Sequence, residues 1–160
     1  MDVKANLERL GLALPAAPEP AGSYLPAVRS GPLLFVSGQL PIIDGKLMAA
    51  GTVPSAVDLD TATQAAARCA LNALAIVAGH LEGDWSRLRR VVRIGVFVAS
   101  DAGFTQQPQV ANGASDLLAQ LLGERGRHAR AAVGASALPL GAPVELEMVV
   151  EVADAEGHLE

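Results

Sequence analysis

The sequence predicts an α+β fold in which two main helices pack on one face of a mixed sheet, with a short extra helix at the N-terminus. Two long stretches, at about residues 60–81 and 109–122, carry apolar residues at helical spacing. Shorter runs rich in β-branched residues lie around them, so the order of the main elements is ββ(β)αβαββ. Residues 89–100 form a buried strand directly after a helix, as in a crossover unit.

The length and composition fit a single domain with its own hydrophobic core. The chain has 160 residues, of which 51% are apolar, which is enough for one core and too little for two domains of ordinary size. We expect an N-terminal helix and proline-rich connector over 1–19, the folded core over 20–153 and a polar tail over 154–160. The expected unit is therefore one domain over residues 1–160.

The charge balance and the single cysteine bear on partners and location. Twelve Lys and Arg residues against 17 Asp and Glu give a net charge of −5, which argues against a nucleic-acid partner. Cys69 cannot form an intramolecular disulfide, and the charged start of the chain lacks an apolar stretch of secretory length. No apolar run is long enough to cross a membrane. We therefore expect a cytoplasmic protein without a membrane partner.

The first half of the chain begins with a short helix and continues into strands. Asp2 precedes residues with helical apolar spacing and can cap a helix that Gly11 ends. Residues 24–28 and 33–37 read as a hairpin whose turn is the quartet 29–32. A third short strand is expected at about 46–50, because the preceding Asp44-Gly45 pair favours a tight turn.

The last third reads as a second hairpin, across Pro139-Leu140-Gly141. Residues 144–152 alternate aliphatic and polar side chains, which places Glu145 on the sheet face opposite the core. If residues 129–138 pair with this strand, Arg130 lies opposite Glu151 and shares that face. Arg130 and Glu145 are then six residues apart, roughly 20 Å, and cannot meet within one chain. A site that contains both must join two copies of the protein.

Four segments carry a resemblance to a known family. They are GSYLPAV (22–28), LLFVSGQLP (33–41), VFVAS (96–100) and HARAAVGASALPLGAPVELE (128–147). In this order they resemble the RidA/YjgF family, also called the L-PSP endoribonuclease family, and most closely a longer branch with an extra N-terminal helix. The resemblance implies a chorismate-mutase-like α+β fold, a homotrimer with sites between subunits, and hydrolysis of reactive 2-aminoacrylate-type enamines and imines to 2-oxo acids and ammonia.

The resemblance also implies roles for particular residues. Arg130 matches the arginine that holds the substrate carboxylate, and Glu145 matches the glutamate that positions water. The other positions implied to line the substrate pocket are Tyr24, Ser37, Gly38, Asn112 and Ala132. The sequence departs from the family pattern at His128, where a proline is common, and at Gly134, where many relatives carry a polar residue.

The residue types suit this chemistry on their own terms. A guanidinium stays charged and can bind a carboxylate through two parallel hydrogen bonds. A half-buried glutamate can hold water and move protons beside an imine carbon. The histidines lack metal-ligand spacing, and the reaction requires neither metal nor cofactor. Two other functions stay open: a non-catalytic protein that binds or senses 2-oxo or amino acids, and an endoribonuclease or translation inhibitor.

Overall fold

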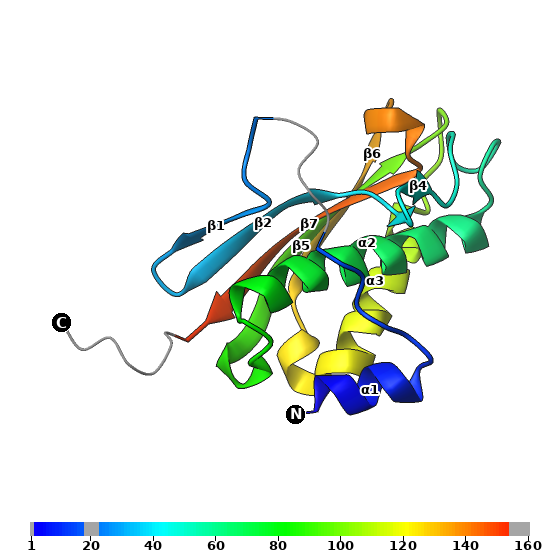
Figure 1. Cartoon of the computed structure of the whole chain (residues 1–160). Helices are drawn as coiled ribbons and strands as arrows, with labels where there is room; N and C mark the ends of the chain where they lie inside the picture. The colour runs from blue at the N-terminus through cyan, green and yellow to red at the C-terminus, as the bar shows by residue number, and fades with distance from the viewer. Residues whose placement is uncertain (1, 18–22, 154–160) are drawn as a thin grey trace.

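The computed structural model describes residues 2–17 and 23–153 and has all its main helices on one face of a mixed sheet (Figure 1). Predictions for residues 18–22 and 154–160 lie outside these described residues. Three short 3₁₀ helices, labelled η, connect the larger elements. The elements are α1 (Val3–Arg9), β1 (Ala27–Ser30), β2 (Leu33–Gln39), β3 (Ile42–Ile43), β4 (Lys46–Leu47), α2 (Leu59–His80), η1 (Trp85–Arg87), β5 (Leu88–Ala99), α3 (Gln107–Leu122), η2 (Gly123–Gly126), β6 (Ala129–Ala135), η3 (Pro139–Gly141) and β7 (Val144–Val152).

The main sheet has the strand order β1-β2-β7-β5-β6, which can be followed in Figure 1. β2 and β5 each run antiparallel to β7, so they are parallel to each other, and α2 connects them across the helical face. β5 and β6 pair in parallel, with α3 as their crossover helix. The predicted α+β class, mixed sheet and two-helix layer are confirmed.

The predicted hairpin between the last two strands is wrong, because β5 lies between β6 and β7. Sequential strands most often pair, which made the hairpin the default expectation. However, β7 presents an unbroken aliphatic stripe to the core and lies under α2, so it occupies the sheet centre. β6 consists largely of alanine and glycine and forms the edge. The loop with η3 therefore carries the chain past β5.

The two hairpins near the N-terminus differ in detail from the predictions. β1 begins at Ala27, three residues after the expected start at Tyr24, and continues through Ser30. Its turn consists of two residues, 31 and 32, because Ser30 pairs directly with Leu33. β3 and β4 form a separate two-stranded sheet around the predicted Asp44-Gly45 turn, where both residues have positive φ.

The helices α1 and α2 begin after aspartate caps, whereas α3 begins at Gln107, two residues before its expected start and without a side-chain cap. The Asp58 carboxylate accepts a hydrogen bond from the Thr61 amide at 2.7 Å, and Asp2 caps α1 in the same way. The α1 helix lies against α3, where the Asn6 side chain donates to the Leu121 carbonyl at 2.9 Å. Within the described residues, no helix is long and apolar enough to span a membrane.

Gly113 sets how closely α2 and α3 approach, and we expect Gly113→Ala to destabilise the protein. A Cβ at this position would overlap the backbone carbonyl of Thr63 on α2. Backbone atoms cannot rotate away, so the helices must separate, at a cost of about 1–3 kcal/mol that exceeds alanine's better helix propensity. Chemical denaturation measures this loss. Gly79→Ala, at a helical glycine with open space around it, is the control and should not be destabilising.

Candidate functional site

Arg130 extends from the edge strand β6 and is held against α3. Its Nη1 donates to Asn112 Oδ1 at 2.9 Å and to Ser115 Oγ at 3.0 Å, and its Nη2 donates to the Pro108 carbonyl at 3.3 Å. All three acceptors belong to the first nine residues of α3. Asn112, which the sequence placed in the pocket, therefore fixes the arginine directly.

The guanidinium keeps part of its binding capacity. An arginine has five N–H groups, and the three bonds above leave Nε–H and one hydrogen on Nη2. The residue is exposed, and across residues 2–17 and 23–153 no carboxylate forms an ion pair with it. Adjacent N–H groups of this kind match the two oxygens of a carboxylate. The three bonds thus hold Arg130 in one orientation and leave two N–H groups whose geometry fits an anion.

Ala132 follows Arg130 by two residues and points to the same face of the sheet. It pairs in register with the buried Val96 and packs against the edge of the core.

Glu145 lies on the opposite, open face of the sheet and is packed against Gly38. A Cβ at position 38 would overlap Glu145 Oε1, so only glycine leaves room for the carboxylate in this position. Ser37 and Gly38 form a bulge in β2, because Val36 pairs with Met148 and Gln39 with Leu146, leaving two residues opposite one. The bulge brings the β2 backbone up to the glutamate.

Two further contacts hold the bulge in place. The Ser37 hydroxyl donates to the Leu25 carbonyl at 2.7 Å, which ties the segment containing the exposed Tyr24 to this end of β2. Gln39 is buried, and its side-chain amide donates to the carbonyls of Ser37 and Gly38 at 3.0 and 3.1 Å. Ser37, Gly38 and Glu145 are therefore brought together, with the Tyr24 segment beside them.

Partial burial raises the pKa of Glu145, and the nearby negative charge of Glu147 adds to the effect. Glu147 itself forms an ion pair with Arg93 at 2.8 Å. A carboxylate with a raised pKa is a stronger base once it is ionised. The geometry therefore gives Glu145 the properties of a group that takes a proton from water.

If Glu145 acts as a base, Glu147→Gln should move the acidic limb of the activity profile to lower pH. Activity requires ionised Glu145, so it rises as pH rises through the pKa of that carboxyl. Removing the neighbouring negative charge makes ionisation easier and lowers this pKa. The measurement is kcat/KM against pH, with Glu151→Gln on the same strand as control. A limb that stays in place in Glu147→Gln would contradict the role of Glu145.

Arg130 and Glu145 do not meet within one chain, although the reason differs from the predicted one. Arg130 is in register with Ile94, which is in register with Met148, so Arg130 faces the helices rather than the carboxylate face. Glu145 lies three residues further along and two strands across, roughly 14 Å away on the other face. The predicted shared face and the six-residue offset are wrong. The expected residues thus form two clusters: Arg130, Asn112 and Ala132, and Glu145, Gly38 and Ser37.

A sequence model of the Endoribonuclease L-PSP family matches residues 14–152 of this chain. The chain belongs to this family. Protein TCP17 of Trypanosoma cruzi is 47% identical over 151 residues, with 94% of each chain covered. Among solved structures of the L-PSP family's fold, protein Atu1372 of unknown function from Agrobacterium tumefaciens is 48% identical, with a TM-score of 0.88, and the match covers 94% of this chain and 93% of that one.

More distant L-PSP relatives keep the same architecture. An endoribonuclease candidate from Shewanella oneidensis is 28% identical, has a TM-score of 0.91, and matches over 95% of this chain and 100% of its own. The RidA/YjgF resemblance inferred from the sequence motifs is therefore confirmed, as is the fold that it implied. The names of these relatives do not assign a reaction to this chain.

Three contacts of the two clusters were missed by the sequence reading. Ser115 and the Pro108 carbonyl bind Arg130, and Gln39 binds the bulge. Gln39 had a visible signal, since it is a polar residue that follows an apolar strand and lies in the SGQ motif. Ser115 had none, because its role depends on the crossover that places α3 beside β6.

Proposed function

We propose that this protein hydrolyses 2-aminoacrylate-type enamines and the corresponding imines to 2-oxo acids and ammonia. The observation that carries the proposal is the state of Arg130: an exposed guanidinium fixed by Asn112, Ser115 and Pro108, with two N–H groups open and no described carboxylate bound. An amino acid-derived imine offers a carboxylate as its one permanent charge. Arg130 would hold that group and present the imine carbon to water.

The reaction needs one water and one group that moves protons. The enamine first takes a proton from solvent at its methylene carbon and becomes the protonated imine. Water then adds to the imine carbon, and Glu145 accepts the proton that water loses. Glu145 returns the proton to nitrogen, the carbon–nitrogen bond breaks as ammonia leaves, and the hydroxyl gives its own proton to the Glu145 carboxylate as it becomes the carbonyl of the 2-oxo acid. Glu145 then releases this proton to ammonia or solvent.

We further propose that the working form is a homotrimer with a site between neighbouring subunits. Support comes from the two clusters, which lie on opposite faces, so that Arg130 of one copy and Glu145 of another must combine. The open face also exposes Val28, Phe35 and Val133, which a second sheet would cover. Light scattering should give the mass of three chains, and a monomer would contradict the shared site.

Co-expression of two inactive variants tests the shared site directly. Arg130→Ala subunits supply intact Glu145, and Glu145→Gln subunits supply intact Arg130. If each site takes one residue from each of two subunits, equal mixing restores about one quarter of the wild-type activity. If both residues of a site came from the same subunit, the mixture would stay inactive.

The activity itself is tested in a coupled assay. A serine dehydratase generates 2-aminoacrylate, and pyruvate formation is followed with and without this protein. Faster pyruvate formation than in buffer supports the proposal, and the absence of acceleration contradicts it. Saturable binding of 2-oxobutyrate without turnover would instead indicate a binding or sensing protein. Salt-dependent RNA binding with cleavage would indicate the ribonuclease activity in the family's name.

A further inference from the structure

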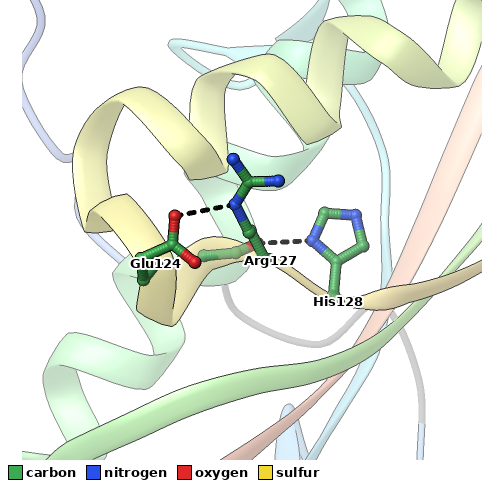
Figure 2. A network of polar contacts seen from close by, with 4 residues as sticks. Glu124, Arg127 and His128 are labelled. Atoms are coloured by element: carbon green, nitrogen blue, oxygen red, sulfur yellow. Dashed lines mark hydrogen bonds and ion pairs between the residues drawn. The ribbon is translucent and has the colours of Figure 1, made fainter.

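Arg130 is one end of a hydrogen-bonded series that continues beyond the residues of the proposed reaction. Its Nη1 donates to Ser115 Oγ at 3.0 Å, and Ser115 Oγ lies 3.1 Å from His128 Nε2. His128 Nδ1 lies 2.6 Å from the Gly126 carbonyl oxygen. Figure 2 shows this last contact as the dashed line from the His128 ring to the backbone beside Arg127.

The proton on each atom of the series follows from its partners. The Gly126 carbonyl can only accept, so His128 Nδ1 carries the hydrogen. In the neutral imidazole with this tautomer, Nε2 has a lone pair and accepts a hydrogen bond from the Ser115 hydroxyl. The hydroxyl hydrogen is thereby turned away from Arg130, and an oxygen lone pair faces the guanidinium. His128 thus fixes the direction in which Ser115 accepts.

The far end of the series is rigid. Gly126 is buried, and it packs so closely on α3 that a Cβ would overlap the Leu118 carbonyl. Asn112 and Ser115 both belong to α3. The series therefore runs from β6 to η2 and is held against α3 both at Ser115 and at Gly126, which limits how far the guanidinium can move.

The charged residues near His128 do not hold Arg130 in place of Ser115 and His128. Arg127 forms an ion pair with Glu124 at 2.9 Å and therefore does not take part in the series (Figure 2). The other charged residues that line the cavities next to His128 are Arg90, Asp116 and Glu151. Within the described part of the chain, none of these three forms a hydrogen bond with Arg130.

We propose that Ser115 and His128 are positioning residues that orient Arg130, so that its Nε–H and remaining Nη2–H face a substrate carboxylate. This inference rests on the proposed function of Arg130 and adds two residues that never touch the substrate. Asn112 and Ser115 occupy both hydrogens of Nη1, which leaves the other edge of the guanidinium for the ligand. That edge presents two parallel donors and selects a planar carboxylate over a neutral group.

The experiment measures the dissociation constants of 2-oxobutyrate and of its neutral amide. Ser115→Ala should weaken 2-oxobutyrate binding roughly 5–20-fold, because the guanidinium loses one of the three hydrogen bonds that orient it, and leave the amide unchanged. His128→Phe should weaken it less, about 2–5-fold, because the hydroxyl stays but can rotate. In turnover, KM should rise and kcat should change little.

Two controls separate positioning from a structural effect. Ser115→Thr keeps the hydroxyl and should bind 2-oxobutyrate within about twofold of wild type. Asp116→Asn changes the next residue of α3, which lines the same cavity, and should not alter the preference for the carboxylate. Alanine favours helix more than serine does, so Ser115→Ala should fold normally, and thermal unfolding checks this.

The outcomes also separate this inference from the proposed function. Wild-type affinity in Ser115→Ala, with weakened binding in Arg130→Ala, overturns the positioning role alone. Carboxylate binding that follows both residues, without turnover in any variant, supports positioning and contradicts the deaminase. Unchanged 2-oxobutyrate affinity in Arg130→Ala overturns both.

Discussion

Arg130→Ala is expected to lower kcat/KM for imine hydrolysis on the order of 10²–10³-fold, which corresponds to about 3–4 kcal/mol of lost transition-state binding. The substitution removes both N–H groups that would hold the carboxylate, and each such charge-assisted bond contributes about 1.5–3 kcal/mol. Arg130→Lys keeps the charge but loses the paired donors, so we expect an intermediate loss. The coupled assay under single-turnover conditions measures these effects.

The control for Arg130→Ala is Arg89→Ala. Arg89 is also an exposed arginine, at the start of β5, so its loss changes the net charge by the same amount. We expect close to full activity in this variant and a change in unfolding free energy within about 0.5 kcal/mol, because the site is on the surface. Arg130→Ala also loses three hydrogen bonds to α3, so its unfolding free energy should fall by more, about 1–2 kcal/mol. Equal losses of activity in the two variants would mean that Arg130 acts only through the overall charge.

Much of the fold could be predicted from local patterns. Apolar spacing located α2 and α3, Asp2 marked the start of α1, and Asp44-Gly45 marked a turn. These features depend on residues close together in the sequence. The alternation in β7 also predicted correctly which of its side chains are buried.

The partner of β6 could not be predicted in this way. Which strand lies beside it depends on the α3 crossover and on β7 entering the centre of the sheet, both of which are long-range events. This error affected the site. With β7 taken as the neighbour of β6 instead of β5, Arg130 was expected on the open face of the sheet, whereas it lies on the face that carries the helices. The motif still names Arg130 as a candidate site residue, since motif recognition does not depend on strand order.

Gly38→Ala is expected to reduce kcat on the order of 10²-fold while the protein stays folded. The new methyl group would occupy the position of the Glu145 carboxylate and displace it. Moving a catalytic group by about 1 Å can have an effect of this size. The displaced atoms lie at the end of a flexible side chain, so we expect the unfolding free energy to change by less than about 1 kcal/mol. Glu145→Gln, which removes the base altogether, should lose 10²–10⁴-fold, as is typical for a general base.

Gly95→Ala provides the matched control, because it makes the same change on the other side of β7. A Cβ at position 95 would lie 2.7 Å from Glu147 Oε1 and would displace Glu147 instead of Glu145. We expect its kcat to stay within about fivefold of wild type at a pH where Glu145 is ionised, since Glu147 affects only the pKa of Glu145. A loss in Gly95→Ala as large as that in Gly38→Ala would show that the open face tolerates no methyl group, and that the position of Glu145 is not what matters.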